Sequence, residues 1–219
     1  MIKAIVFDFD GTIADTIPAI REGVNATMQL HGYPEHSIEA VLSFINMGAR
    51  SLIQSAMPAH LREDEGLVDA VLRDYHRCYG AVYHHTETAY EGMAEMIQRL
   101  RKDYRIGVLS NKQDEFVKKL TAQVLLPASW DAAQGVVEGH PTKPHPYLSE
   151  RIAAELGVSP SECILVGDSD IDILTAKNAG MTHIGVTWGF RSESFLREHG
   201  ARLLAHTPEE LEKMIRSIR

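Results

Sequence analysis

The stretch that decides the fold is Lys3-Ala4-Ile5-Val6-Phe7-Asp8-Phe9-Asp10-Gly11-Thr12. A short apolar run rich in β-branched residues ends at two carboxylates spaced two residues apart, and a glycine follows at once. The pattern predicts a buried strand with its charges at the carboxyl end, which is where open α/β sheets bind ligands. Carboxylates at such a strand end can hold a hard cation, and they can also supply a nucleophile and an acid/base. Gly11 lets the backbone turn sharply and bring its N–H close to an anion.

Strand and helix patterns alternate in the second half of the chain, from Met93 onward. Further strands are expected at Arg105–Leu109, Asp131–Val136, Cys163–Val166 and His183–Val186. Helices are expected at Met93–Arg101, Asp114–Val124, Pro146–Leu156 and Ile171–Ala179, and a last helix begins after the cap residue Thr207. Such alternation is typical of an α/β fold in which helices cover both faces of a doubly wound parallel sheet.

The segment from Asp15 to about His85 has a different pattern, with apolar residues at helical spacing and without a clear strand. The pattern predicts helices from Ile17 to Met28, over Ile38–Phe44, over Ala49–Met57 and from Leu67 to Val82. Four helices joined by short loops favour a compact bundle of about 70 residues. We therefore expect a core domain formed by residues 1–14 and 86–219, and an inserted helical cap domain formed by residues 15–85.

Composition narrows the class of function. The formal net charge of −8 over 219 residues argues against a nucleic-acid partner. The sequence has no apolar run of the ~20 residues that a membrane span needs, so no membrane partner is expected. The two cysteines, Cys78 and Cys163, lie far apart without a metal-binding spacing, which favours a reducing cytoplasmic setting.

Polar side chains follow the strong strands. Ser110-Asn111-Lys112 follows the second strand, and Asp168 with Asp172 follows the strand at Cys163–Val166. Thr142-Lys143-Pro144 places a lysine between a threonine and a proline just before a helix. Because the carboxyl ends of parallel strands meet at one edge of a sheet, these groups are expected to lie near Asp8.

These clusters resemble the four motifs of the haloacid dehalogenase superfamily, in order and across nearly the whole chain. The matching segments are Asp8-Phe9-Asp10-Gly11-Thr12, Ser110-Asn111, Lys143-Pro144, and Gly167-Asp168-Ser169 with Asp172. The helical insertion between the first and second motifs is similar to the helical cap of that family. The resemblance implies a Rossmann-like sheet with strand order 5-4-1-2-3.

The resemblance also implies roles for the matching residues. The catalytic set is Asp8 as nucleophile, Asp10 as acid and base, Ser110 and Lys143, and the substrate-binding set is Gly11, Thr12 and Asn111. The metal site implied is one for Mg²⁺, formed by Asp8, Asp10 through its backbone carbonyl, and Asp168, with Asp172 holding metal-bound water or Lys143. The charges support a metal, because four aspartates face one lysine and would repel a phosphate without a divalent ion.

Several branches of the family fit less well than phosphatases. Dehalogenases lack the acid that Asp10 provides and need no metal. β-Phosphoglucomutase-like enzymes typically carry a histidine where this chain has Ile17–Arg21, and phosphonoacetaldehyde hydrolases need a cap lysine, whereas residues 15–85 contain none. Ser110-Asn111-Lys112 and the cap segment Asn46-Met47-Gly48-Ala49-Arg50 look most like phosphoglycolate phosphatases. Arg50 is then expected to bind a carboxylate or a second phosphate of the substrate.

The expected partner is therefore a small phosphorylated metabolite, with 2-phosphoglycolate as the first candidate. A pyrophosphatase, a nucleotidase or a sugar-phosphate phosphatase of the same superfamily stays open, because cap loops decide the substrate. An alternative from a different class is a phosphate-sensing, receiver-like regulatory domain that is phosphorylated without turnover. A helical cap has no purpose in a simple receiver, and receivers carry their phosphorylated aspartate after the third strand rather than the first.

Overall fold

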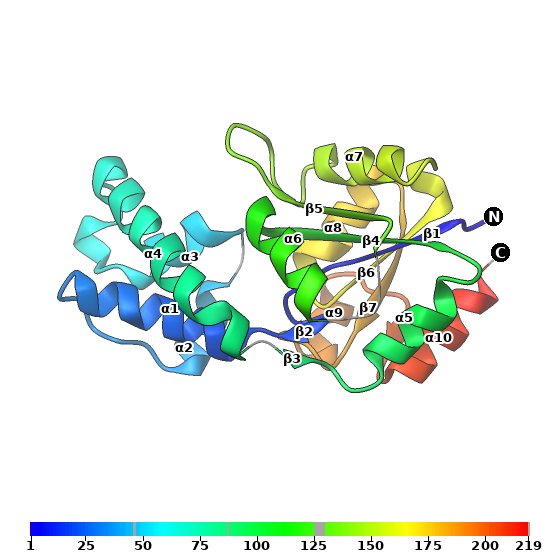
Figure 1. The fold of residues 1–219 in the computed structure, drawn as a ribbon, viewed down its shortest axis with the longest axis horizontal. Coiled ribbons are helices and arrows are strands. Elements are labelled where there is room, and N and C mark those ends of the chain that lie inside the picture. Colours follow the sequence, from blue (N-terminus) through cyan, green and yellow to red (C-terminus); the bar gives the residue numbers. More distant parts are fainter. Residues whose placement is uncertain (46, 87, 125–129, 219) are drawn as a thin grey trace. The chain divides into compact units, whose positions relative to one another are not determined.

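The structure is a computed structural model that describes residues 1–45, 47–86, 88–124 and 130–218. The chain divides into two compact units (Figure 1). Unit 1 consists of Met1–Asp15 and Ala89–Arg219, and unit 2 consists of Thr16–Thr88. The chain passes between the units at a two-stranded sheet, in which β2 (Ala14–Asp15) pairs with β3 (Thr88–Ala89).

Unit 1 is built on a six-stranded sheet in the order β5-β4-β1-β6-β7-β8. Its strands are β1 (Ala4–Phe7), β4 (Arg105–Gln113), β5 (Ala132–Val136), β6 (Cys163–Gly167), β7 (Thr182–Val186) and β8 (Leu204–Ala205). All their pairings are parallel. When the strands of this sheet are counted along the chain, the first five lie in the order 5-4-1-2-3, which confirms the order that the family resemblance implied, and β8 extends one edge.

The central strand β1 is buried along its whole length, as its apolar run predicts. Phe7, its last residue, pairs with Val108 of β4 on one side and with Val166 of β6 on the other. This register sets the residues that follow the three strands side by side at one edge of the sheet. The edge carries the polar clusters that the sequence analysis identified.

Helices pack on both faces of this sheet. They are α5 (Met93–Leu100), α6 (Asp114–Gln123), α7 (Tyr147–Glu155), α8 (Asp170–Ala179), α9 (Glu193–Glu198) and α10 (Pro208–Ser217). On one face, Ile152 of α7 and Ala176 of α8 join Val6 and Leu165 of the sheet in one apolar cluster. The helices α5 and α10 lie side by side across the sheet from α7 (Figure 1). This arrangement is the doubly wound α/β architecture expected from the alternating pattern.

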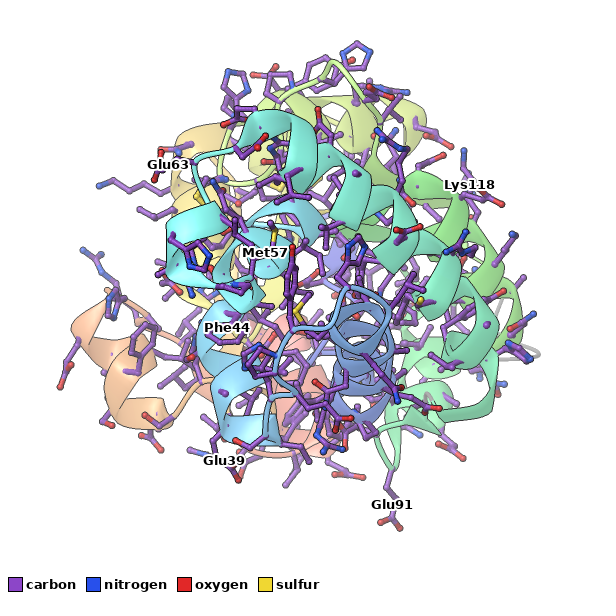
Figure 2. All side chains as sticks on the ribbon, turned by 90° about the vertical axis from the view of Figure 1, so that its left-hand side faces the viewer. Glu39, Phe44, Met57, Glu63, Glu91 and Lys118 are labelled. Carbon is purple, nitrogen blue, oxygen red and sulfur yellow. The ribbon has the colours of Figure 1, made fainter. Side chains whose placement is uncertain are left out.

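Unit 2 is a helical bundle. It comprises α1 (Ile17–Leu30), α2 (Ile38–Phe44), α3 (Ala49–Ala56) and α4 (Glu65–Thr86), with a short 3₁₀ turn at Ala59–Leu61. The long helices α1 and α4 pack closely, since a Cβ at Gly23 would lie 3.1 Å from the Cα of Tyr79. Met57 is buried in the middle of the bundle, whereas Glu39 and Glu63 point outward (Figure 2).

The structure differs from the sequence expectation in three elements of unit 1. β4 does not end at Leu109 but continues to Gln113, with a shift in its pairing to β5 after Leu109. The short elements α9 and β8 were not predicted, because each buries few apolar side chains and gives only a weak pattern. No helix among the described residues is long and apolar enough to cross a membrane.

Candidate active site

A buried lysine connects two carboxylates at the sheet edge. Lys143 Nζ lies 2.9 Å from Asp8 Oδ1 and 2.7 Å from Asp172 Oδ1. The Lys143 side chain is 2 % exposed and Asp172 is fully buried. A lysine so deeply buried is stable only when its charge is paired, so these two ion pairs fix its position.

Each member of this cluster is held by its local sequence. Asp8 follows β1, and its Oδ1 accepts a hydrogen bond of 2.7 Å from the N–H of Phe9. Asp172 lies in the first turn of α8, where it forms a capping box with Ser169. Gly167 makes room for it, because a Cβ at that position would collide with the Asp172 carboxyl group.

Asn111 was predicted to bind substrate, but its amide is bonded to the backbone of Lys143. Its Oδ1 accepts from the Lys143 N–H at 2.8 Å, and its Nδ2 donates to the Lys143 carbonyl at 3.0 Å. Asn111 therefore holds the backbone of Lys143 in this structure. The neighbouring Ser110 is 1 % exposed, and its Oγ accepts the N–H of Lys112 at 3.2 Å.

Asp168 is a buried carboxylate of the site, and both of its oxygens accept hydrogen bonds. Thr12 Oγ1 donates to its Oδ1 at 3.0 Å, and the Phe190 N–H donates to its Oδ2 at 2.7 Å. Gly11 has φ +75°, and a Cβ there would lie 2.5 Å from Asp168 Oδ2. Gly11 thus turns the backbone as predicted, while Thr12, predicted to bind substrate, orients Asp168 here.

Lys112 is a second lysine of the site, and the sequence analysis assigned it no role. Its Nζ lies 3.0 Å from Asp10 Oδ1, and its side chain is only 7 % exposed. The signal that could have identified it is its position two residues after Ser110, at the same sheet edge as Asp10. With Lys112 included, four aspartates face two lysines, so a single divalent cation balances the charge.

The pKa values reflect this crowding of negative charge. Burial raises the pKa of Asp8 well above its usual range, although Lys143 opposes the effect, and Asp172 and Asp168 add to it. Burial, followed by the charge of Asp172, raises the pKa of Asp168 to about 7. Burial lowers the pKa of Lys143, but Asp172 and Asp8 outweigh it and the net shift is upward. The site is therefore short of positive charge.

The donor set fits a divalent metal ion. One carboxylate oxygen each from Asp8, Asp168 and Asp172 can lie within 4.8 Å of the others, and all three residues are buried. Hard cations such as Mg²⁺ take oxygen ligands, usually one or two carboxylates completed by water and substrate oxygens. The raised pKa values of Asp8 and Asp168 also favour a metal site, because they show that the charged carboxylates lack a compensating positive charge. A bound cation would supply that charge and favour their charged forms.

The cap residue Arg50 is engaged within unit 2. Arg50 is the second residue of α3, and its guanidinium forms ion pairs with Glu65 and Asp69 of α4. Its side chain is 40 % exposed, so these pairs are accessible to water. Asn46, part of the same predicted segment, lies outside the described residues.

Comparisons with known proteins agree with this geometry. Residues 5–186 match the family model for haloacid dehalogenase-like hydrolases. A phosphoglycolate phosphatase from Xanthomonas campestris is 31 % identical over 195 residues, which cover 86 % of this chain and 85 % of that protein. A phosphoglycolate phosphatase from Vibrio parahaemolyticus is 28 % identical over a region that covers 95 % of this chain and 90 % of that protein.

Among solved structures, a candidate phosphoglycolate phosphatase from Lactobacillus delbrueckii is 31 % identical, with a TM-score of 0.88 over 97 % of this chain and 98 % of that one. A predicted phosphatase from Clostridium acetobutylicum shares the fold, with a TM-score of 0.89 at 20 % identity over both full chains. The family match covers most of the chain and spans all four motifs. The chain therefore belongs to the haloacid dehalogenase-like hydrolases, as an enzyme of the phosphoric monoester hydrolase class.

Proposed function

We propose that the protein is a Mg²⁺-dependent phosphatase that hydrolyses small phosphomonoesters through an aspartyl-phosphate intermediate, with 2-phosphoglycolate as substrate and glycolate as product. The observation that carries the proposal is the cluster of Asp8, Lys143, Asp172 and Asp168 at the carboxyl edge of the sheet. It combines a carboxylate nucleophile with a buried cation and a donor set for a metal.

In the first step, an Asp8 carboxylate oxygen attacks the phosphorus atom and the bond to the ester oxygen breaks. Asp8 is suited to this role because it follows a fully buried strand and its Oδ1 is oriented by the Phe9 N–H. Lys143 contacts Asp8 at 2.9 Å, which favours the charged form of the carboxylate against the effect of burial and brings positive charge to the transferring phosphoryl group. Ser110, a buried residue of β4, would donate its hydroxyl to a phosphoryl oxygen.

Asp10 acts as the general acid and then as the general base. It gives a proton from its carboxyl group to the departing ester oxygen, and it later takes one from the water that attacks the phosphoenzyme. That water releases phosphate and restores Asp8. Lys112 Nζ, 3.0 Å from Asp10 Oδ1, holds the side chain of this acid and base in place.

Mg²⁺ would be held by Asp8, the Asp10 backbone carbonyl and Asp168. Asp172 would hold metal-bound water or Lys143, with which it forms an ion pair. When bound, Mg²⁺ supplies the positive charge that the four aspartates and two lysines leave unbalanced, and so offsets the charge of the phosphoryl oxygens. The sequence resemblance and the buried carboxylates together support this choice of ion.

The chemistry is tested by phosphate release from p-nitrophenyl phosphate, with Mg²⁺ and with EDTA. We expect many turnovers with Mg²⁺ and a loss of activity with EDTA. Asp8→Asn should abolish both turnover and covalent labelling, and Asp10→Asn should slow turnover by roughly 10²–10⁴-fold. Asp170→Asn, in the same helical turn as Asp172, is the matched control and should remain active. Release of a single equivalent of phosphate would instead favour the receiver-like alternative, and full activity in EDTA would contradict the metal dependence.

The substrate is tested by comparing kcat/KM for 2-phosphoglycolate with that for 2-hydroxyethyl phosphate, in which a neutral group replaces the carboxylate. Exposed ion pairs contribute little stability, so a substrate carboxylate can take the place of Glu65 or Asp69 on Arg50. We expect the wild type to prefer the charged substrate and Arg50→Ala to lose that preference. Arg77→Ala, which removes an arginine paired with Asp74 in the same unit, should keep it.

A clearly higher kcat/KM for a nucleotide, pyrophosphate or a sugar phosphate than for 2-phosphoglycolate would overturn the phosphoglycolate assignment and leave the phosphatase chemistry intact. A preference for 2-phosphoglycolate that survives Arg50→Ala would overturn only the role of Arg50.

A further inference from the structure

The loop that follows β7 lies directly against the metal-binding carboxylate Asp168. A Cβ added at Gly189 would collide with the Gly11 carbonyl oxygen and with the Asp168 Cβ, so the backbone passes as close as packing permits. The next residue, Phe190, donates its N–H to Asp168 Oδ2 at 2.7 Å. The loop therefore contacts the turn after β1 and the carboxylate after β6 at once.

Trp188 extends this contact to the turn itself. Its indole Nε1–H donates to the Thr12 carbonyl at 3.0 Å, and the Thr12 hydroxyl in turn donates to Asp168 Oδ1 at 3.0 Å. Trp188 also packs edge-on against Tyr90, with the ring centroids 6.4 Å apart. Tyr90 donates its N–H to the Ile13 carbonyl, so it also contacts the turn after β1.

We propose that Trp188 is a positioning residue for metal binding, which acts through Thr12 to fix the orientation of the Asp168 carboxylate. The two oxygens of Asp168 accept hydrogen bonds from two different donors, Thr12 and Phe190, and the Trp188–Phe190 segment supports both contacts. The indole holds the backbone of Thr12 by its hydrogen bond, and the close packing at Gly189 positions the N–H of Phe190. Neither residue has to touch the metal to influence it. The inference rests on the proposed metal site.

The expected size of the effect follows from the burial of Asp168. A carboxylate that is enclosed by protein binds a cation well only if one oxygen already points at it, because reorientation is resisted by the surrounding packing. Groups that orient metal ligands typically contribute 10–100-fold in affinity. Trp188 is one step further from the ligand than Thr12, so its removal should weaken Mg²⁺ binding by roughly 10-fold, at the lower end of that range.

The chain offers a matched control. It contains two tryptophans, and the indole N–H of the other, Trp130, donates at 2.9 Å to the carbonyl of Thr121 on α6. Trp188→Phe and Trp130→Phe thus remove the same type of hydrogen bond from the same unit, and only the first lies on the path to Asp168. Each variant also leaves one tryptophan as a fluorescent probe.

The test is calorimetric titration of each full-length protein with Mg²⁺ alone, without substrate, at a temperature where circular dichroism shows all variants folded. We expect Trp188→Phe to raise the Kd for Mg²⁺ about 10-fold and Trp130→Phe to leave it within 2-fold of the wild type. Mg²⁺ should change the emission of the Trp130→Phe protein, which reports on Trp188, and not that of the Trp188→Phe protein.

A double variant tests the route through Thr12. Thr12→Val removes the hydroxyl that donates to Asp168, so if Trp188 acts through Thr12 the two changes should be less than additive in their effect on Kd. A Trp188→Phe protein with wild-type Kd overturns the inference and leaves the proposed function standing. Full additivity overturns the route through Thr12. A wild type that binds no Mg²⁺ overturns the proposed metal site itself, and the inference with it.

Discussion

At the scale of the residue, the buried carboxylates make the metal-free protein sensitive to pH. The pKa of Asp168 is raised to about 7 by burial and by Asp172, whereas an unfolded aspartate titrates near pH 4. Between about pH 4 and 7 the folded protein therefore holds a proton that the unfolded chain releases. The free energy of unfolding should fall as the pH rises through this window, and Asp8, whose pKa is also raised by burial, acts in the same direction.

The free energy contributed by His183 changes with pH in the opposite direction. Burial lowers the pKa of His183 to about 4, so the unfolded chain takes up its proton first as the pH falls below about 6.5. The total pH profile mixes these contributions. The difference between wild type and a variant at Asp168 isolates the carboxylate, because His183 is common to both.

We predict that Asp168→Asn stabilises the metal-free protein at pH 8. The amide carries no charge to bury, and it can still accept from the Phe190 N–H and donate to the Thr12 hydroxyl. One pKa unit corresponds to about 1.4 kcal/mol, so a gain of roughly 1–3 kcal/mol is expected at pH 8, shrinking toward pH 5. The measurement is thermal unfolding in EDTA between pH 5 and 8. Asp170→Asn, two residues further along the chain at the start of α8, should show no such gain. A pH-independent difference for Asp168→Asn would contradict the assigned pKa shift.

The residues of the site could be predicted from the sequence to different degrees. Asp8, Lys143, Asp168 and Asp172 come together as expected, because each follows a strand or precedes a helix with a strong pattern. The contacts of Asn111 and Thr12 could not be predicted, since their partners are set by backbone positions far along the chain. The same holds for Trp188, which lies in a loop without periodicity.

At the scale of the element, β4 shows where a pattern-based prediction stops. Its apolar run ends at Leu109, and the polar residues that follow indicated a loop, yet the strand continues to Gln113. Backbone pairing with β5 resumes there after a shift in register, and such pairing does not depend on apolar side chains. Because of this extension Ser110 and Lys112 lie on a strand, which gives both side chains a firmer support than a loop.

The interior of β4 also contains a close contact that requires glycine. A Cβ at Gly107 would lie 2.9 Å from Ile152 Cδ1 and 3.1 Å from Leu156 Cδ1, where α7 packs on the sheet. We predict that Gly107→Val destabilises unit 1 by about 1–3 kcal/mol through overpacking. Urea unfolding followed by tryptophan fluorescence measures this, since Trp130 and Trp188 both lie in unit 1.

Gly66→Ala is the contrasting variant, and because it lies in unit 2 its unfolding is followed by circular dichroism of the helices. It lies in α4, and its added Cβ would find its neighbour, Asp64 Oδ1, at 3.5 Å. Alanine favours a helix over glycine by about 1 kcal/mol, so this variant should not lower stability. An unchanged midpoint for Gly107→Val would show that α7 can move away from the sheet at little cost.

At the scale of the whole molecule, the residues of the proposed metal site all belong to one unit. The carboxylates Asp8, Asp168 and Asp172 and both site lysines come from unit 1, whereas Arg50 comes from unit 2. Each unit also has its own buried apolar residues, such as Val6 and Leu165 in the first and Val24 and Val71 in the second. This division predicts that metal binding and substrate preference can be separated.

We predict that unit 1 folds and binds Mg²⁺ when residues 16–88 are replaced by a short Gly/Ser linker. The linker has little distance to span, because the replaced segment starts directly after β2 and ends within β3, the strand that pairs with β2. The shortened protein should bind Mg²⁺ with a Kd within about 3-fold of the full chain, since the proposed ligands are all retained. It should also lose the preference for 2-phosphoglycolate over 2-hydroxyethyl phosphate, because Arg50 is gone. Calorimetry and kcat/KM measure the two properties, and the same shortened chain carrying Asp168→Asn controls for metal bound elsewhere. Retained preference in the shortened protein would place carboxylate recognition in unit 1, whereas failure to bind Mg²⁺ despite a folded sheet would mean that unit 2 contributes to the metal site.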